Sequence, residues 1–501
     1  MERLRRIEPL ELGPGQPVAS ESIDLRIPHP DLISLAPSRL EVTIEQCRAW
    51  TLESNLDLRV VLLDPDIAGT LLSEEEAAFE AAFVGRIGFS EADRARGQVF
   101  PDRSPEPFDF DAGVRVPLRS GGFANVRVPI ERNETFPGSD GEDRWSADLE
   151  LSVSLPLLRN AGRWTNSHGI RIAALDTDIA QARTKLEVIR RIAAVDRAYW
   201  LVVESIELLG VRQDQLDQAL RQLDQADQRF LGKVAPRIDV VRSEAGVSRR
   251  LASIIDAELL VKDRQRELKR LVNQPGLDVD SSTLLVPASA PDPARYQLVA
   301  EQLVQDALAR RMELLELELR LAQDLSTIDF SRNQELPLFA LDYVYRFDGY
   351  GDGFGSAAGR LGRVESDGWV VGVTAEVPLG NEGAQARSHR AILTRLQRLA
   401  TRASREQSIK QEVLAALDNL EAGWRRILAA KQNAVAEAAN YRAEQGQYQI
   451  GLRNSTEVLD AESRLSDARA EEVRAIADYQ IAQIDLAFAT GMLLGAARVS
   501  W

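Results

Sequence analysis

Two very long helical stretches constrain the fold of this chain more than any other feature of its sequence. Residues 163–229 contain no proline, and apolar side chains recur at alternating spacings of three and four, from Ile192 through Tyr199 to Leu223. Such heptads are typical of helices that pack along one another as coiled coils. With a rise of about 1.5 Å per residue, this helix would be roughly 100 Å long, which exceeds the size of a compact domain. Residues 384–448 repeat the pattern and predict a second helix of matching length.

Four segments of alternating polarity predict β-strands beside these helices. In residues 145–155 every second side chain is apolar, and the side chains between them are serine or acidic. The same period appears in residues 369–377, and we expect segments 83–90 and 339–347 to be the hairpin partners of these two. Period-two patterning over about 9–11 residues, bounded by aromatics, has the length of a transmembrane strand. A hairpin at the edge of a soluble core is the commoner explanation for one such strand, but four at matched positions favour the membrane.

The order of the predicted elements repeats and divides the chain into two halves. Residues 1–39 form an N-terminal extension, and residues 40–275 give a helix, strand, loop, strand, long helix, turn and helix. A proline-containing linker, 276–297, separates them from residues 298–497, where the same order recurs. The loop 92–144 between the first two strands is long and shows some further alternation of apolar residues.

Composition excludes several classes of function. The net charge of −16, from 61 basic and 77 acidic residues, argues against a nucleic-acid binder that depends on phosphate contacts. The single cysteine, Cys47, excludes a disulfide framework and a thiolate metal centre, and we expect it to be a buried small hydrophobe. The histidines His29, His168 and His389 are far apart, so we expect no metal site and no cofactor. Without a nucleophile–base or nucleotide motif, we do not expect an enzyme.

The sequence contains no run approaching about 18 apolar residues, so we expect no transmembrane helix, and a membrane role would have to be built from strands. The amino terminus is basic at Arg3, Arg5 and Arg6, but no apolar core of about 7–15 residues follows it. We therefore see no export signal in this sequence, and attribute its absence to an upstream start or an altered terminus.

Closure of the predicted sheet requires more than one chain. Open sheet edges are not tolerated in hydrocarbon, and four membrane-length strands cannot close a barrel. Three copies would supply twelve strands, and the same symmetry would assemble the coiled coils into a tube. We therefore expect a mainly α fold with a β membrane part, in which antiparallel coiled-coil helices form a tunnel below a twelve-stranded barrel of a homotrimer.

Several motifs resemble the TolC-like outer-membrane channels of tripartite efflux and type I secretion systems. The resemblance covers roughly residues 40–497, and it is carried by the two strand-to-helix junctions, the two coiled-coil turns and the ending: SLPLLRNAGRW (154–164), EVPLGNEGAQAR (376–387), FLGKVAPRIDVVRSE (230–244), YQIGLRNSTEVLDAES (448–463) and LAFATGMLLG (486–495). It implies an outer-membrane homotrimer with a periplasmic tunnel that passively conducts substrates. It also implies outer-membrane lipid, a periplasmic adaptor (membrane fusion) protein and an inner-membrane transporter as partners.

The resemblance further implies a gate at the periplasmic tip. In the family a tyrosine, an arginine and two acidic residues at the second turn close the entrance, and they correspond to Tyr448, Arg453, Glu457 and Asp460. The first acidic position is glutamate here, where aspartate is typical. Asp239 is the expected first-half partner, although its turn has one extra residue and contains a proline. The exposed tips expected to contact the adaptor are Leu231, Gly232, Lys233, Gly451 and Leu452.

One alternative remains at this point. A soluble cytoplasmic coiled-coil scaffold without channel activity would fit the acidic charge and the missing export signal. It would leave the four alternating strands unexplained, so the channel is the preferred hypothesis.

Overall fold

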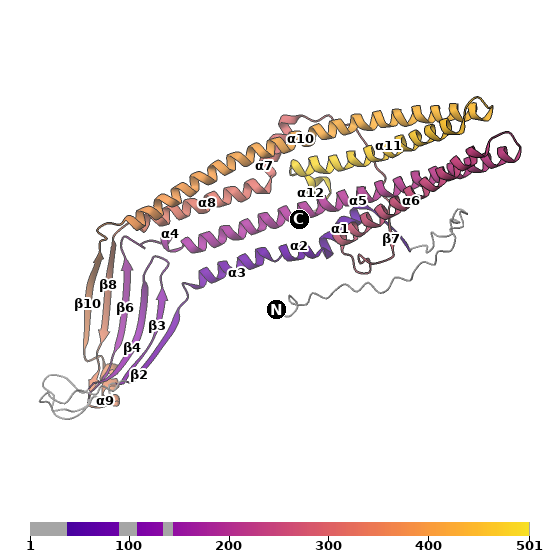
Figure 1. Ribbon diagram of the computed structural model, residues 1–501. Helices are drawn as coiled ribbons and strands as arrows, with labels where there is room; N and C mark the ends of the chain where they lie inside the picture. The colour runs from indigo at the N-terminus through magenta and orange to yellow at the C-terminus, as the bar shows by residue number, and fades with distance from the viewer. Residues whose placement is uncertain (1–37, 90–107, 134–143, 500–501) are drawn as a thin grey trace, which may run out of the picture.

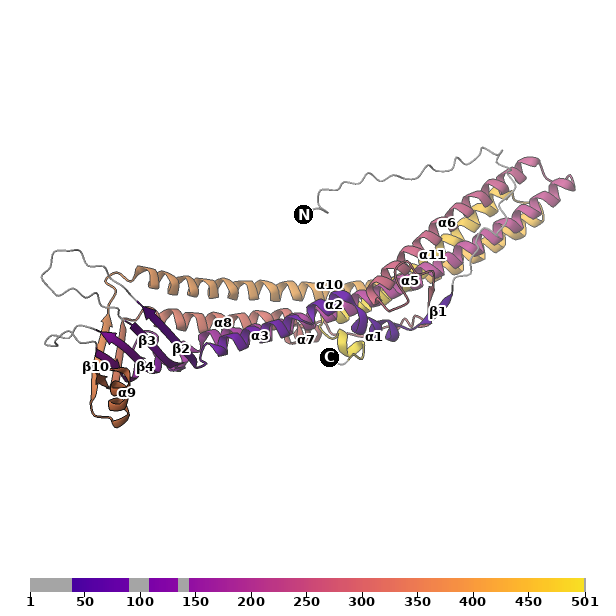
Figure 2. The ribbon, with the colours of Figure 1, turned by 90° about the horizontal axis from the view of Figure 1, so that it is seen from below.

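The computed structural model describes residues 38–89, 108–133 and 144–499. The molecule is elongated, with a β-sheet at one end and long helices that run from it to two tips at the other (Figure 1, Figure 2). Most of the predicted N-terminal extension, the end of the predicted strand 83–90 and parts of the predicted loop 92–144 lie outside the described residues.

Two antiparallel helical hairpins make up most of this length. The first joins α5 (His168–Leu231) to α6 (Arg237–Val272), and the second joins α10 (Glu382–Gln449) to α11 (Ser455–Ala489). Helix α10 has 68 residues, which corresponds to about 100 Å. The two long helices predicted from the heptads are thus confirmed. The shorter helices are α1 (Ile44–Ser54), α2 (Leu56–Val61), α3 (Asp64–Ala77), α4 (Arg163–Asn166), α7 (Ala300–Arg310), α8 (Met312–Asn333), α9 (Phe354–Arg363) and α12 (Leu493–Ala496).

The apolar stripes of these helices form the cores. In α5, Ile192, Val195 and Tyr199 are fully buried and pack with residues of α1, α6, α11 and α12. A second cluster joins α7 and α8 to α10 and α11. Cys47 of α1 is free and fully buried in the first cluster, as predicted, and burial raises the pKa of its thiol to about 12. Among the described helices, none combines the length and the apolar composition that crossing a membrane requires.

The sheet at the far end is antiparallel throughout. Its six long strands lie in the order β10-β8-β6-β4-β3-β2, and two short strands, β5 and β9, extend it at one end. Apart from this sheet, β1 pairs in parallel with β7. The bounds are β1 (Arg39–Val42), β2 (Ala82–Phe89), β3 (Phe108–Pro117), β4 (Phe123–Asn133), β5 (Arg144–Ala147), β6 (Leu149–Pro156), β7 (Leu284–Pro287), β8 (Leu338–Phe347), β9 (Tyr350–Gly351) and β10 (Asp367–Glu376).

The sheet corrects the predicted strand pairing. We expected 145–155 to pair with 83–90 across a loop, but β3 and β4, which lie within that loop, stand between β2 and β6. Strand β6 therefore pairs with β4 on one side and β8 on the other, while β8 and β10 form the expected second hairpin. The described residues supply six long strands to this sheet where four were expected.

Candidate functional site

The ends of the two helical hairpins form the candidate site, and they lie together at the end of the molecule opposite the sheet (Figure 1, Figure 2). The first hairpin turns between Leu231 and Arg237, and the second between Gln449 and Ser455. All of the predicted gate and tip residues lie in or beside these two turns. The structure thus brings the two predicted sets into one region of the fold.

The two turns differ in which residue takes the left-handed backbone conformation. Gly451 has a φ of 82°, a left-handed conformation that favours glycine and terminates α10. Gly232 does not have this conformation: its φ is −74°, because its amide continues the helix by donating to the carbonyl of Gln228. Lys233 takes the left-handed position instead, with a φ of 57°. The left-handed residue of the first turn is therefore Lys233, one residue after Gly232.

The tips expose apolar side chains. Leu231 is 78% exposed and Leu452 is 72% exposed, and Val234 and Ile450 beside them are equally open. Exposed apolar side chains that cluster at a polar surface mark sites for protein contact. The predicted adaptor-contact residues Leu231, Gly232, Lys233, Gly451 and Leu452 are all exposed.

Arg453 forms its ion pairs within its own hairpin. Its Nη1 lies 2.8 Å from Oε1 of Glu457, and its Nε lies 3.2 Å from Oε2 of Glu444 and donates to Gln447 at 2.9 Å. Glu457 has a second task, because its other oxygen accepts the Asn454 amide in a capping box at the start of α11. This backbone hydrogen bond, with Arg453, lowers the pKa of Glu457.

Tyr448 is buried beneath Arg229 of the other hairpin. The guanidinium carbon of Arg229 lies 4.2 Å from the centre of the Tyr448 ring, and its Nη2 donates to the Tyr448 carbonyl oxygen at 3.0 Å. The Tyr448 hydroxyl is buried and has no hydrogen-bond partner among the described residues. A buried hydroxyl without a hydrogen bond lowers the stability of the folded state.

The predicted gate residues Asp239 and Asp460 differ in their contacts. Asp239, in the first turn of α6, accepts a hydrogen bond from the Ser455 hydroxyl at 3.0 Å and lies 3.8 Å from Arg242. Asp460 is exposed on α11. Within the described part of the chain, no ion pair joins Arg453 to Asp239 or to Asp460.

Sequence reasoning missed a buried ion pair behind the tip. Arg250 of α6 and Glu462 of α11 face each other with two nitrogen–oxygen distances of 3.4 Å, and their side chains are 9% and 1% exposed. Burial raises the pKa of Glu462, and Arg250 partly offsets that effect. Arg250 could have been found, because it occupies an apolar-seam position at heptad spacing from Val247 and Ile254.

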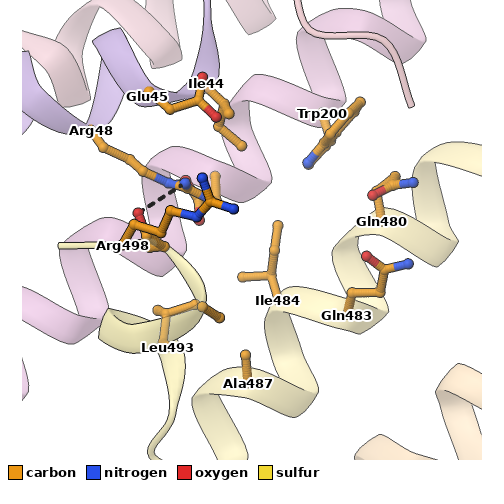
Figure 3. A pocket seen from close by; sticks show the side chains of 13 residues that line it. Ile44, Glu45, Arg48, Trp200, Gln480, Gln483, Ile484, Ala487, Leu493 and Arg498 are labelled. Carbon is orange, nitrogen blue, oxygen red and sulfur yellow. Dashed lines mark hydrogen bonds and ion pairs between the residues drawn. The ribbon is translucent and has the colours of Figure 1, made fainter. Parts of the chain in front are cut away.

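A separate cavity lies at mid-length, between α1, α5, α11 and the C-terminal residues, with a volume of about 450 Å³ (Figure 3). Arg48 donates two hydrogen bonds to the Asp196 carboxylate on its wall, at 2.8 and 2.9 Å, and burial raises the pKa of Asp196. The side-chain nitrogen of Gln480 has no hydrogen-bond partner among the described residues. The pair of Arg48 and Asp196 joins α1 to α5 at this cavity.

No group of histidine, cysteine, aspartate or glutamate side chains in the described ranges has the arrangement of a metal site. The described residues of the tips offer ion pairs, an unsatisfied hydroxyl and exposed apolar contacts. Such an arrangement can hold or release a protein contact.

Comparison with known proteins gives consistent matches. A sequence model of the outer membrane efflux protein family matches residues 303–492. The outer membrane protein TolC of Vibrio cholerae serotype O1 is 25% identical over 372 residues, which cover 73% of this chain and 80% of that protein. Among solved structures, the Campylobacter jejuni CmeC outer membrane channel superimposes with a TM-score of 0.68 at 14% identity, covering 90% and 86% of the two chains. The open state of the Neisseria gonorrhoeae MtrE outer membrane channel gives a TM-score of 0.61 at 17% identity, covering 90% and 89%.

Proposed function

Because this chain belongs to the TolC-like family of outer-membrane efflux proteins, we propose that three copies form a channel across the outer membrane and the periplasm. The channel passively conducts substrates delivered by an inner-membrane transporter and a periplasmic adaptor. The observation that carries this proposal is the joining of helices about 100 Å long to a sheet whose exposed side chains include Phe83, Phe89 and Trp369. A scaffold in water would leave those side chains without an apolar environment.

We propose that the tips form the gate of this channel. Three-fold symmetry would place three copies of Arg453, Glu457 and Asp460 around one axis, where ion pairs between and within chains hold a closed state. Tyr448 supports this role by packing beneath Arg229 of the other hairpin, a contact that holds the two turns of one chain together. Asp239 contributes by tying the start of α6 to the start of α11.

The adaptor would contact the exposed tips. Leu231 and Leu452 offer apolar surface to it, and Lys233 adds one positive charge. Because Gly451 and Leu452 directly precede Arg453 in the chain, an adaptor bound there would disturb the Arg453 ion pairs. Adaptor binding at Gly451 and Leu452 would thus open the gate by breaking the ion pairs of the adjacent Arg453.

Single-channel conductance in planar bilayers tests both parts. We expect the purified trimer to insert and to give stable openings, and we expect Arg453→Ser to raise the fraction of time open. The matched control is Arg425→Ser, which removes an exposed arginine of α10 from its pair with Glu421, far from the tip. A monomer that never inserts would overturn the channel. Insertion with equal open fractions for the Arg453 and Arg425 variants would overturn the gate alone.

A further inference from the structure

The hairpin of β3 and β4, absent from the expected strand pattern, has the side-chain alternation of its neighbours. Successive side chains of a strand point to opposite faces of the sheet. On one face the side chains of the hairpin are apolar except for Arg132 near the end of β4, and they include Phe110, Val114, Val116, Val126, Val128 and Ile130. On the other face most of its side chains are charged or polar, among them Asp109, Asp111, Arg115, Asn125, Arg127 and Glu131.

The register aligns the apolar side chains of all six strands. Directly paired residues form one unbroken row across β2, β3, β4, β6, β8 and β10: Phe83, Val114, Val126, Leu151, Tyr345 and Trp369. Within the described chain, Phe83 and Trp369 at the ends of this row are 75% and 66% exposed, and Val126 in its middle is 48% exposed. Apolar residues that face outward on every strand are the pattern of a surface in contact with lipid.

The charged side chains of the opposite face are joined into a belt. Glu150 of β6 pairs with Arg127 of β4 at 2.8 Å and with Arg346 of β8 at 3.1 Å, and Arg127 lies 3.6 Å from Asp111 of β3. The belt thus continues without a break from β8, through β6, into the hairpin. A polar interior face opposite a lipid-facing one is typical of barrels that enclose water.

The closed end of the hairpin lies level with the strand-to-helix junctions. The turn between β3 and β4 closes with a hydrogen bond from the Leu118 amide to the Gly122 carbonyl at 3.0 Å. The Ser120 carbonyl accepts the amide of Gly162, which directly precedes α4, at 2.9 Å. The Arg119 guanidinium lies 5.8 Å from the ring of Phe79, which follows α3. The turn of the hairpin therefore lies at the level where the neighbouring strands connect to helices.

From this register we infer that β3 and β4 are membrane strands, so that each chain supplies six strands and the trimer closes an eighteen-stranded barrel. This inference rests on the proposed trimeric channel and replaces the twelve strands expected from four per chain. Strands β2 and β10, the two edges of the long-strand order, would pair between neighbouring copies. Eighteen is an even number within the known range of outer-membrane barrels.

The consequence for function is a wide exit. Barrel diameter grows roughly in proportion to strand number, so eighteen strands give a barrel about half again as wide as twelve, a size that leaves an aqueous channel. Selection of cargo would then fall to the tips, while the charged belt of Arg127, Glu150 and Arg346 lines the exit.

Cysteine accessibility tests the inference, in a Cys47→Ala background that contains no other cysteine. The reconstituted trimer is treated with a charged, membrane-impermeant thiol reagent. Two adjacent positions on β3, Val114→Cys on the apolar face and Arg115→Cys on the polar face, are compared with Val373→Cys and Thr374→Cys on β10. We expect labelling at Val114 and Val373 to be at least tenfold slower than at their neighbours. Val126→Cys and Asn125→Cys on β4 provide a second hairpin pair should a β3 variant fail to assemble.

The outcomes separate this inference from the proposed function. Equal, fast labelling at positions 114 and 115, with position 373 still protected, would overturn the six-strand barrel and leave a channel with fewer membrane strands. Equal labelling at 373 and 374 as well would mean that β10 does not face lipid, and the channel itself would fail. Protection at 114, 126 and 373 with fast labelling at 115, 125 and 374 supports eighteen strands.

Discussion

The buried pair of Arg250 and Glu462 gives the sharpest test of what holds the two hairpins together. It spans α6 and α11 behind the tips, and its side chains are 9% and 1% exposed. An exposed ion pair contributes about 0–1 kcal/mol, but removing one partner of a buried pair leaves an uncompensated charge and costs about 3–5 kcal/mol. We therefore expect Arg250→Met to destabilise the contact between α6 and α11 by about 3–5 kcal/mol per chain above neutral pH.

The pH dependence of this loss follows from the pKa of Glu462. Burial already raises that pKa in the native protein, and Arg250 partly offsets the shift. Without Arg250 the pKa rises further, so the folded state takes up a proton more readily than the unfolded state. The stability contributed by a group with a raised pKa is present at acid pH and is lost as pH rises through the folded pKa. Arg250→Met should thus be most damaging at alkaline pH and less damaging in acid.

Hydrogen exchange of α6 and α11, followed from pH 5 to pH 9 after correction for intrinsic exchange rates, measures this contact in the assembled protein. The double variant Arg250→Met, Glu462→Gln is the matched control, because it removes both charges and keeps similar volumes. We expect the double variant to recover most of the protection and to lose the pH dependence. Equal loss in the single and double variants, or a loss that does not change with pH, would refute the reasoning.

Three further predictions concern other parts of the molecule. Gly122→Ala should prevent correct trimer assembly, because its φ is +75° and a Cβ there would lie 1.8 Å from the Ser154 carbonyl oxygen; Gly380→Ala, with open space around it, is the control, and gel filtration gives the trimer yield. The Cys47 thiol, with a pKa raised to about 12, should be inert to a thiol reagent at pH 8 in the native protein and react on denaturation; fast native labelling would contradict its burial. Glu457→Gln keeps a capping-box side chain but loses the charge that faces Arg453, so we expect an open fraction raised severalfold with unchanged thermal stability, whereas Glu457→Ala should raise the open fraction as much and also lower the thermal stability.

Local periodicity accounts for the parts of the fold that the sequence could predict. The 3-4 spacing in residues 384–448 depends only on near neighbours in the chain, and α10 occupies that range. The same is true of the alternation that becomes β8 and β10. The hairpin of β3 and β4 showed its alternation too, but each strand of it is separated from the next predicted strand by a stretch without period-two pattern. A strand count based on the clearest four segments therefore placed it in a loop.

Contacts between distant segments could not be predicted in this way. Arg250 and Glu462 are separated by 212 residues, and nothing in their local sequence states which helix faces which. The charge of Arg250 within an apolar seam signals that a partner exists without naming it. The position of the left-handed residue in the first turn, at Lys233 rather than Gly232, depends on where the last helical hydrogen bond forms. The division into repeats at 40–275 and 298–497 stays a prediction.

The ion pairs near the tips differ in burial, and this difference separates a permanent contact from one that a partner can displace. Arg250 and Glu462 are shielded from water, so changes in salt or in a bound partner have little effect on them, and they keep the two hairpins of one chain together. Arg453 and Glu457 are 41% and 37% exposed, so their pair is weak and open to competition. Weak pairs repeated around a three-fold axis can bias an equilibrium between closed and open states and still be displaced by a protein bound one or two residues away. We therefore expect opening to separate the tips of neighbouring chains at Arg453 while each chain keeps its Arg250–Glu462 contact.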